Sequence, residues 1–126
     1  MKVVAIVQAR TGSTRLNEKV LKPLGESTVI EFLITRLQKS EEIDEIVIAT
    51  STKTEDNKIE DIFKNSGIKI YRGSEEDVLD RYMQAAKESE ADVITRITGD
   101  CPLVDPISVD DCIKKIKQTG LDYVSN

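Results

Sequence analysis

The sequence contains no histidine and no tryptophan, and only two of its 126 residues are cysteines. The absence of histidine excludes a Ser-His-Asp triad, a Cys-His pair and histidine-bound metal centres. Cys101 and Cys112 do not form a Cys-x-x-Cys motif, so we expect two reduced thiols rather than a zinc site or a disulfide framework. Any chemistry must therefore use carboxylates, cations and hydroxyl groups.

Long apolar runs are also absent. No stretch approaches the roughly 20 apolar residues of a membrane span, and the first residues lack the pattern of a signal peptide. We therefore expect a cytoplasmic chain that does not interact with a membrane. The formal charge of −5 and the pI near 4.8 argue against nucleic-acid binding, since that binding relies on a broad basic surface.

What the sequence does contain predicts one ordered domain over residues 1–126. The composition is 39% hydrophobic and 33% charged with only six glycines and three prolines, as in a globular domain rather than a disordered chain. Apolar, β-branched runs alternate with amphipathic segments, which predicts an α/β fold with a mainly parallel sheet. The expected strands cover residues 3–7, 45–50, 68–71, 92–98 and 122–125.

Helix start signals lie between these strands. The pairs Thr28 with Glu31, Thr52 with Glu55, and Ser74 with Asp77 have the spacing of N-terminal capping motifs. Asp105 followed by Pro106 predicts the start of the last helix, and Gly67 is expected in a left-handed conformation after the second. For the third helix, periodicity predicts a buried stripe. That stripe comprises Val78, Leu79, Tyr82, Met83 and Ala86.

Positive charge is concentrated directly after the first strand. The segment 8–25 carries Arg10, Arg15, Lys19 and Lys22 against a single acid. Cations, hydroxyl groups and accessible backbone N–H groups at the end of a strand suit a nucleoside triphosphate, although neither the P-loop nor the dinucleotide-binding pattern is present. The alternative is a solvated surface loop with scattered cations.

Other polar residues are expected at the same edge of the sheet. Ligands of open parallel sheets bind beyond the carboxyl ends of the strands. The second strand is followed by hydroxyl groups that include Ser51 and Thr52, the third by Arg72, and the fourth by Gly99 and Asp100. One carboxylate can hold Mg²⁺ when phosphate oxygens and water complete the shell. From spacing alone, Asp100 is equally well explained as a metal ligand and as a turn residue.

Two motifs closely resemble the cytidylyltransferase family. These are residues 7–16, Val-Gln-Ala-Arg-Thr-Gly-Ser-Thr-Arg-Leu, followed by Lys19, and residues 96–103, Arg-Ile-Thr-Gly-Asp-Cys-Pro-Leu, followed by Asp105 and Pro106. Within the family the chain looks most like the spore coat polysaccharide biosynthesis protein F group. That group is related to the synthetases of CMP-linked sugar acids.

The resemblance implies a Rossmann-like three-layer α/β/α fold of the nucleotide-diphospho-sugar transferase type. It implies transfer of CMP from CTP to a sugar acid or related precursor of surface or spore coat polysaccharide, with Mg²⁺ as cofactor and release of pyrophosphate. By position, Asp100 would bind the metal and Ala9 would lie against the nucleoside. The remaining residues expected at the nucleotide are Arg10, Gly12, Ser13, Arg15, Lys19, Ser51 and Thr52; of these, Arg10, Arg15 and Lys19 would act in catalysis.

The chain departs from the family in two respects. Complete members are usually about twice as long, and their later part supplies a second metal carboxylate, much of the acceptor site and often the dimer contacts. The sugar-acid synthetases commonly have glutamine where this chain has Thr98. The chain therefore resembles the N-terminal half of such an enzyme. One alternative to a cytidylyltransferase is a nucleotide-binding module that needs a partner chain or a homodimer to supply the missing half. Another is an enzyme that uses another nucleotide.

Overall fold

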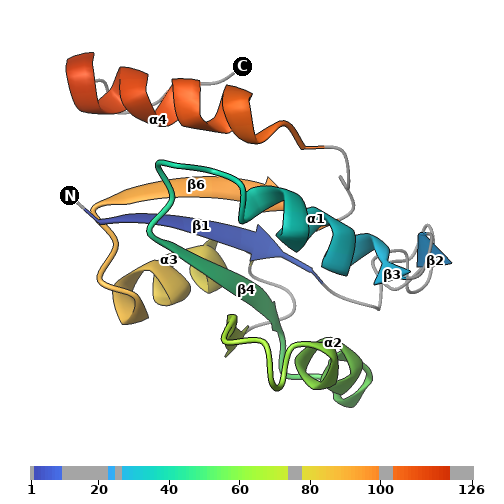
Figure 1. The fold of residues 1–126 in the computed structure, drawn as a ribbon. Helices are drawn as coiled ribbons and strands as arrows, with labels where there is room; N and C mark the ends of the chain where they lie inside the picture. Colours follow the sequence, from blue (N-terminus) through green and yellow to red (C-terminus); the bar gives the residue numbers. More distant parts are fainter. Residues whose placement is uncertain (1, 10–22, 25–26, 74–77, 100–103, 120–126) are drawn as a thin grey trace.

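The structure is a computed structural model, and it describes residues 2–9, 23–24, 27–73, 78–99 and 104–119. Four parallel strands form the central sheet in the order β5-β4-β1-β6 (Figure 1). Their bounds are β1 (Val3–Gln8), β4 (Glu45–Ser51), β5 (Lys69–Gly73) and β6 (Val93–Thr98). The parallel α/β architecture predicted from the alternating pattern is confirmed.

Helices cover both faces of this sheet, with α1 in front of it and α3 behind it in the view of Figure 1. The other elements are a short antiparallel pair, β2 (Pro23–Leu24) and β3 (Ser27–Thr28), one 3₁₀ turn, η2 (Thr54–Asp56), and the helices α1 (Val29–Leu37), α2 (Asn57–Ile62), α3 (Val78–Glu88) and α4 (Pro106–Thr119). In the described part of the chain, no helix has the length and apolar character needed to cross a membrane.

Strand β1 forms the centre of the core. Its residues Val3 to Val7 are fully buried, and because side chains alternate along a strand, they fill both sides of the sheet. Ala5 and Val7 pack in one cluster with residues of α1 and α2, and Val4 and Ile6 pack in another with residues of α3. Val3 joins β6 and α4 in a third cluster. The five-residue apolar run therefore forms the strand that the sequence predicted, and it is buried on both faces.

Two of the predicted helix starts are confirmed. Thr28 and Glu31 form a reciprocal capping box at the start of α1. Asp105 accepts a hydrogen bond of 3.0 Å from the backbone N–H of Ile107, and Pro106 is the first residue of α4. Both caps satisfy N–H groups that a helix cannot pair internally.

Other local predictions are wrong. Thr52 and Glu55 form no capping box, because η2 precedes α2 and begins after Lys53 without a side-chain cap. In α3, Leu79 and Met83 are 62% and 50% exposed instead of buried. The predicted Ser74 cap and the strand at 122–125 lie outside the described residues.

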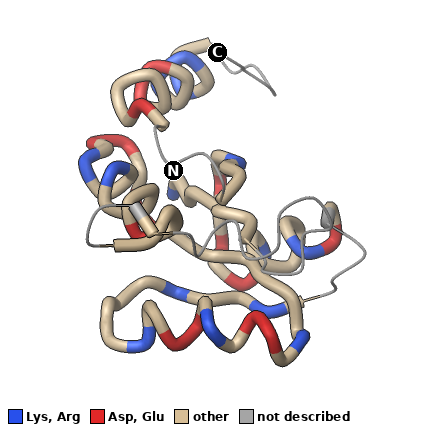
Figure 2. The backbone as a smooth tube through the Cα atoms, turned by 90° about the vertical axis from the view of Figure 1, so that its right-hand side faces the viewer, with Lys and Arg blue, Asp and Glu red and all other residues tan. Residues whose placement is uncertain are grey.

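Gly67 has the expected positive φ of 80°, but it does not directly terminate α2. That helix ends at Ile62, and hydrogen-bonded turns over Phe63 to Ser66 separate the two. The β2 and β3 pair was not predicted. Along the described chain, charges of both signs alternate over the helices and loops rather than gathering by sign (Figure 2).

Candidate functional site

The carboxyl ends of β1 and β6 meet at the point where the strand order reverses. From β1 the chain continues through β4 to β5 on one side and returns to β6 on the other, which makes this edge the expected ligand crevice of an open α/β sheet. The Gly99 N–H donates a 2.7 Å hydrogen bond to the Gln8 carbonyl, and the Ala9 N–H donates a 3.0 Å bond to the Ala49 carbonyl. Backbone hydrogen bonds thus fix both strand ends.

Gly99 is required at this junction by space rather than by backbone torsion. A Cβ atom there would lie 2.7 Å from the Gln8 carbonyl oxygen and 2.9 Å from the Ala9 Cβ. Ala9 itself is only 2% exposed. Ala9 and Gly99, which each belong to one of the two motifs, therefore lie side by side at this edge of the sheet.

The end of β4 adds a buried hydroxyl group. Ser51 is 1% exposed, its hydroxyl donates a hydrogen bond to the Asp56 carboxylate, and it accepts a 3.2 Å hydrogen bond from the Lys53 N–H. Asp56 is also 1% exposed. Ser51 and Asp56 therefore fix the turn after β4, with Thr52 exposed on it.

Arg72 also binds this turn. Its guanidinium donates hydrogen bonds to the Ser51 carbonyl at 2.8 Å and to the Lys53 carbonyl at 2.6 Å, and it also bonds to Asn57. An ion pair of 3.2 Å with Glu60 extends these contacts onto α2. We expected Arg72 to add a cation to the ligand edge; the structure shows that it ties β5 to the β4–α2 connection.

A pair of a cationic and an aromatic side chain, Arg96 and Tyr82, fixes α3 against β6. The Arg96 guanidinium carbon lies 4.4 Å from the centre of the Tyr82 ring, and the Tyr82 hydroxyl donates a 3.3 Å hydrogen bond to the Ile97 carbonyl. Burial raises the pKa of Tyr82, although Arg96 and Arg81 act in the opposite direction. The phenol is therefore a neutral donor at physiological pH.

The predicted site residues fall into two groups. Ala9, Ser51 and Thr52 lie at the carboxyl edge of β1 and β4, where they were expected, although the hydroxyl of Ser51 is engaged by Asp56. The other predicted residues lie outside the described part of the chain. They are Arg10, Gly12, Ser13, Arg15, Lys19 and Asp100.

Asp56 and the partners of Arg72 were not foreseen at this site. The only sequence signal for the burial of Asp56 is its place five residues after a strand-end serine. Among the described residues, no cluster of three histidine, cysteine, aspartate or glutamate side chains could hold a metal.

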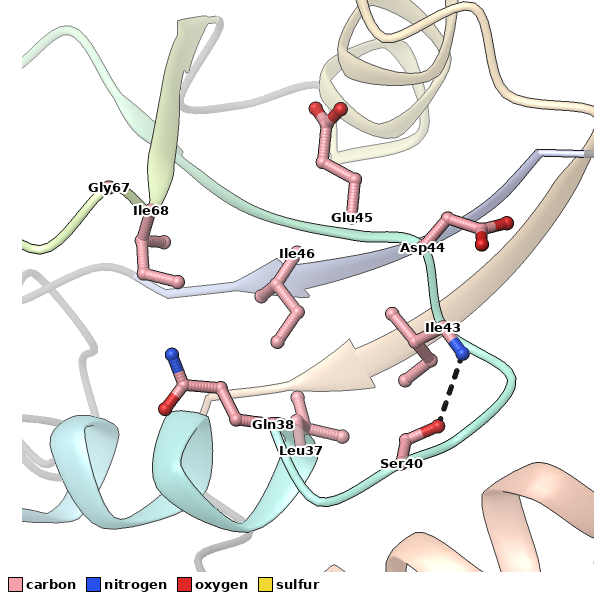
Figure 3. Close-up of a pocket in the computed structure, with 9 residues that line it drawn as sticks. All are labelled: Leu37, Gln38, Ser40, Ile43, Asp44, Glu45, Ile46, Gly67 and Ile68. Carbon is pink, nitrogen blue, oxygen red and sulfur yellow. Dashed lines mark hydrogen bonds between the residues drawn. The ribbon is translucent and has the colours of Figure 1, made fainter.

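A pocket of about 300 Å³ lies at the opposite, amino-terminal edge of β4. Its floor is apolar, with Leu37, Ile46 and Ile68 pointing into it, whereas the Glu45 side chain points away (Figure 3). This pocket does not contact the junction of β1 and β6.

The model of the cytidylyltransferase family matches residues 4–126. The chain belongs to this family. It is 46% identical over 125 residues to the uncharacterized protein MJ1063 of Methanocaldococcus jannaschii, covering 99% of this chain and 51% of that protein. It is 42% identical over 125 residues to the spore coat polysaccharide biosynthesis protein SpsF of Bacillus subtilis, covering 96% of this chain and 52% of that protein. The chain thus spans about half the length of these relatives.

Solved structures agree with this assignment. A cytidylyltransferase from Leptospira borgpetersenii is 39% identical, with a TM-score of 0.90 over 94% of this chain and 50% of that one. A CMP:2-keto-3-deoxy-manno-octonic acid synthetase complexed with CTP shares the fold, with a TM-score of 0.85 over 95% of this chain and 49% of that one at 24% identity. The Rossmann-like nucleotidyltransferase fold implied by the motifs is confirmed.

Proposed function

We propose that this chain forms the nucleotide-binding half of a cytidylyltransferase that transfers CMP from CTP to a sugar acid or a related precursor of surface polysaccharide. The observation that carries the proposal is the close approach of Ala9 and Gly99 at the sheet's switch point. It brings together the start of the basic segment and the residue before Asp100, which suits a triphosphate with its metal.

The reaction would be an in-line displacement at the α-phosphorus of CTP. An acceptor oxygen forms the new bond to phosphorus, the bond to the bridging oxygen of pyrophosphate breaks, and the acceptor proton passes to solvent. Negative charge grows on the transferred and leaving phosphates, so Arg10, Arg15 and Lys19 would stabilise the transition state. Gly12, Ser13, Ser51 and Thr52 would position the nucleotide through backbone and hydroxyl groups. No side-chain nucleophile is needed.

Asp100 is the residue that would hold Mg²⁺. A single carboxylate fits this ion because phosphate oxygens and water normally supply its other ligands, and the described residues offer no competing cluster. When bound, the metal would neutralise charge on the phosphates. The tight contact of Gly99 with Gln8 and Ala9 would fix where the chain enters Asp100.

Direct titration with CTP tests the proposal. At a concentration about 100 times the Kd, CTP in the presence of Mg²⁺ should stabilise the chain by roughly 2.7 kcal/mol. Arg10→Ala and Asp100→Ala should each weaken this response. Lys39→Ala and Glu88→Gln serve as charge-matched controls, since these exposed residues lie at the ends of α1 and α3 remote from the carboxyl edge. A wild-type chain that millimolar CTP and Mg²⁺ do not stabilise contradicts the proposal.

The coverage of about half of each relative favours one alternative, a module that binds nucleotide but needs a partner for catalysis. Binding of CTP without pyrophosphate release, across a panel of sugar-acid acceptors, would identify this module. Competition among CTP, UTP, GTP and ATP would in turn identify an enzyme that uses another nucleotide.

A further inference from the structure

Hydrogen bonds hold the chain on both sides of the short segment that contains Asp100. Before this segment, the Gly99 N–H donates a 2.7 Å hydrogen bond to the Gln8 carbonyl. After it, the Arg36 Nε–H donates a 2.7 Å hydrogen bond to the Val104 carbonyl. Asp100 is the first residue between the two held positions, so both bonds bear on where the chain can place it.

The bond from Arg36 joins the end of α1 to the start of α4. Arg36 lies in the last turn of α1, and Val104 comes just before the first residue of α4, Pro106. The Val104 side chain is partly buried against the cluster that includes Leu33 of α1 and the cluster that includes Val109 of α4. Packing therefore holds the side chain of Val104, and Arg36 orients its carbonyl. Because both groups are attached to one tetrahedral carbon, the direction of its backbone nitrogen, through which the chain arrives, is set as well.

The charge of Arg36 alone does not account for this bond. A cation in the last turn of a helix interacts favourably with the helix dipole, but that role needs no donor directed at one distant carbonyl. The exposed Lys39, just beyond α1, supplies a positive charge to the same helix end. The short distance to the Val104 carbonyl is typical of a charge-assisted hydrogen bond. Arg36 thus has a directed contact in addition to its charge.

We propose that Arg36 is a positioning residue for the Mg²⁺ of the CTP complex, because its bond to Val104 keeps Asp100 in place for the metal. The inference rests on the proposed function, in which Asp100 holds that ion. A ligand that is already positioned loses less conformational freedom when the metal binds, so the site binds it more tightly. Arg36 touches neither nucleotide nor metal in this role. Its effect is therefore confined to the part of CTP binding that depends on Mg²⁺.

Calorimetric titration with CTP, once in Mg²⁺ and once in EDTA, tests the proposal on a matched pair of variants. Arg36→Met places a methyl group at the position of Nε, whereas Arg36→Gln keeps an N–H donor there, and both remove the positive charge. Arg36→Met should raise the Kd for CTP about tenfold in Mg²⁺ and leave it unchanged in EDTA. Arg36→Gln should bind CTP as the wild type does in both solutions. Thermal unfolding checks that each variant is folded.

A double-mutant cycle shows whether the effect passes through Asp100. In the Asp100→Ala background, Arg36→Met should cause no further loss of CTP affinity in Mg²⁺, because residues that act as one unit are not additive. Additive losses, an equal loss in Mg²⁺ and in EDTA, or no loss at all would overturn the inference and leave the proposed function standing. A wild-type chain that does not bind CTP would overturn both.

Discussion

Thr50 shows how a single buried hydroxyl group can lower stability. It is fully buried near the carboxyl end of β4, and its Oγ1 has no hydrogen-bond partner in the described part of the chain. An unsatisfied buried hydroxyl costs about 1–3 kcal/mol, so Thr50→Val should raise the free energy of unfolding by about 1 kcal/mol in chemical denaturation without nucleotide. The same substitution at Thr28 removes the α1 cap and should lower the free energy of unfolding by about 1 kcal/mol. A loss of stability in Thr50→Val would contradict this account.

Glu90 shows backbone strain at a single residue. It has a φ of 56° and lies where α3 ends, with the Ala91 N–H bonded to the Ala86 carbonyl and the Glu90 N–H bonded to the Lys87 carbonyl. This pair of bonds defines a Schellman motif, in which glycine is usual because a side chain in the left-handed region costs roughly 1–2 kcal/mol. Glu90→Gly should therefore raise the melting temperature. Glu88→Gly, inside α3, should lower it, and a fall in both variants would contradict the assignment.

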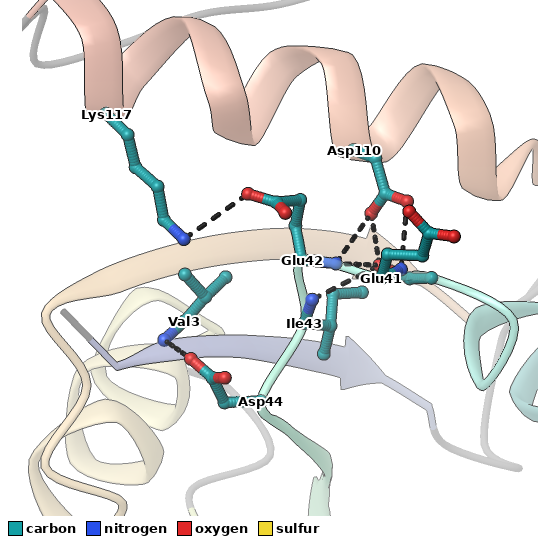
Figure 4. A network of polar contacts seen from close by, with 8 residues as sticks. Val3, Glu41, Glu42, Ile43, Asp44, Asp110 and Lys117 are labelled. Carbon is teal, nitrogen blue, oxygen red and sulfur yellow. Dashed lines mark hydrogen bonds and ion pairs between the residues drawn. The ribbon is translucent and has the colours of Figure 1, made fainter.

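At the scale of elements, Asp110 attaches α4 to the turn between α1 and β4 (Figure 4). Its carboxylate accepts hydrogen bonds from the Ser40 hydroxyl and from the backbone N–H groups of Glu41 and Glu42. Burial acts to raise the pKa of Asp110, but these hydrogen bonds and the charge of Lys114 outweigh it, and the pKa is lowered. The ion pair of Lys117 with Glu42 at 3.3 Å adds a second link.

The direction of this shift sets a pH dependence. A carboxylate with a lowered pKa in the folded state contributes stability above its unfolded pKa, and that contribution is lost as the pH falls through the folded value. Asp110→Asn should thus cost about 2 kcal/mol near pH 7, and the difference from wild type should shrink below the ordinary value of 3.8. Asp111→Asn, at an exposed neighbour, is the control. A cost that does not change with pH would exclude the charge as its source.

At the scale of the whole molecule, the sequence predicted what depends on local pattern. The apolar run of β1, the alternation of strands and helices, and the caps at Thr28 and Asp105 could all be read from it. The buried side of α3 could not be predicted from the sequence, because apolar character alone favoured burial of Leu79 and Met83. The sheet buries the flank with Arg81 instead, and Leu79 and Met83 remain exposed.

The candidate site divides in the same way. The alternation of strands and helices predicted that Ser51 follows the second strand at the carboxyl edge of the sheet, and the structure places both Ala9 and Ser51 at that edge. The partners of Arg72 could not be predicted, because its contacts with Ser51 and Lys53 join residues about twenty positions apart. Such contacts depend on strand order, which local pattern does not encode.

The arrangement of the core predicts that α4 opens separately from the sheet. Val109 and Ile113 pack on Val3 and Val93 in a cluster of their own, whereas Ile6 packs with α3 on the other face. Ile6→Val should lower the free energy of global unfolding by about 0.5–1.5 kcal/mol. If α4 detaches while the sheet stays folded, Ile6→Val destabilises the native state and the opened state equally. The free energy of opening α4 is then unchanged.

Native-state hydrogen exchange measures both processes. Ile6→Val should therefore speed exchange of the β1 amides and leave the α4 amides unchanged. Asp110→Asn should speed exchange of the β1 and the α4 amides, because the hydrogen bonds of the Asp110 carboxylate are lost in the opened state as well as in the unfolded state. Equal acceleration of β1 and α4 by Ile6→Val would mean that α4 opens only when the whole domain unfolds.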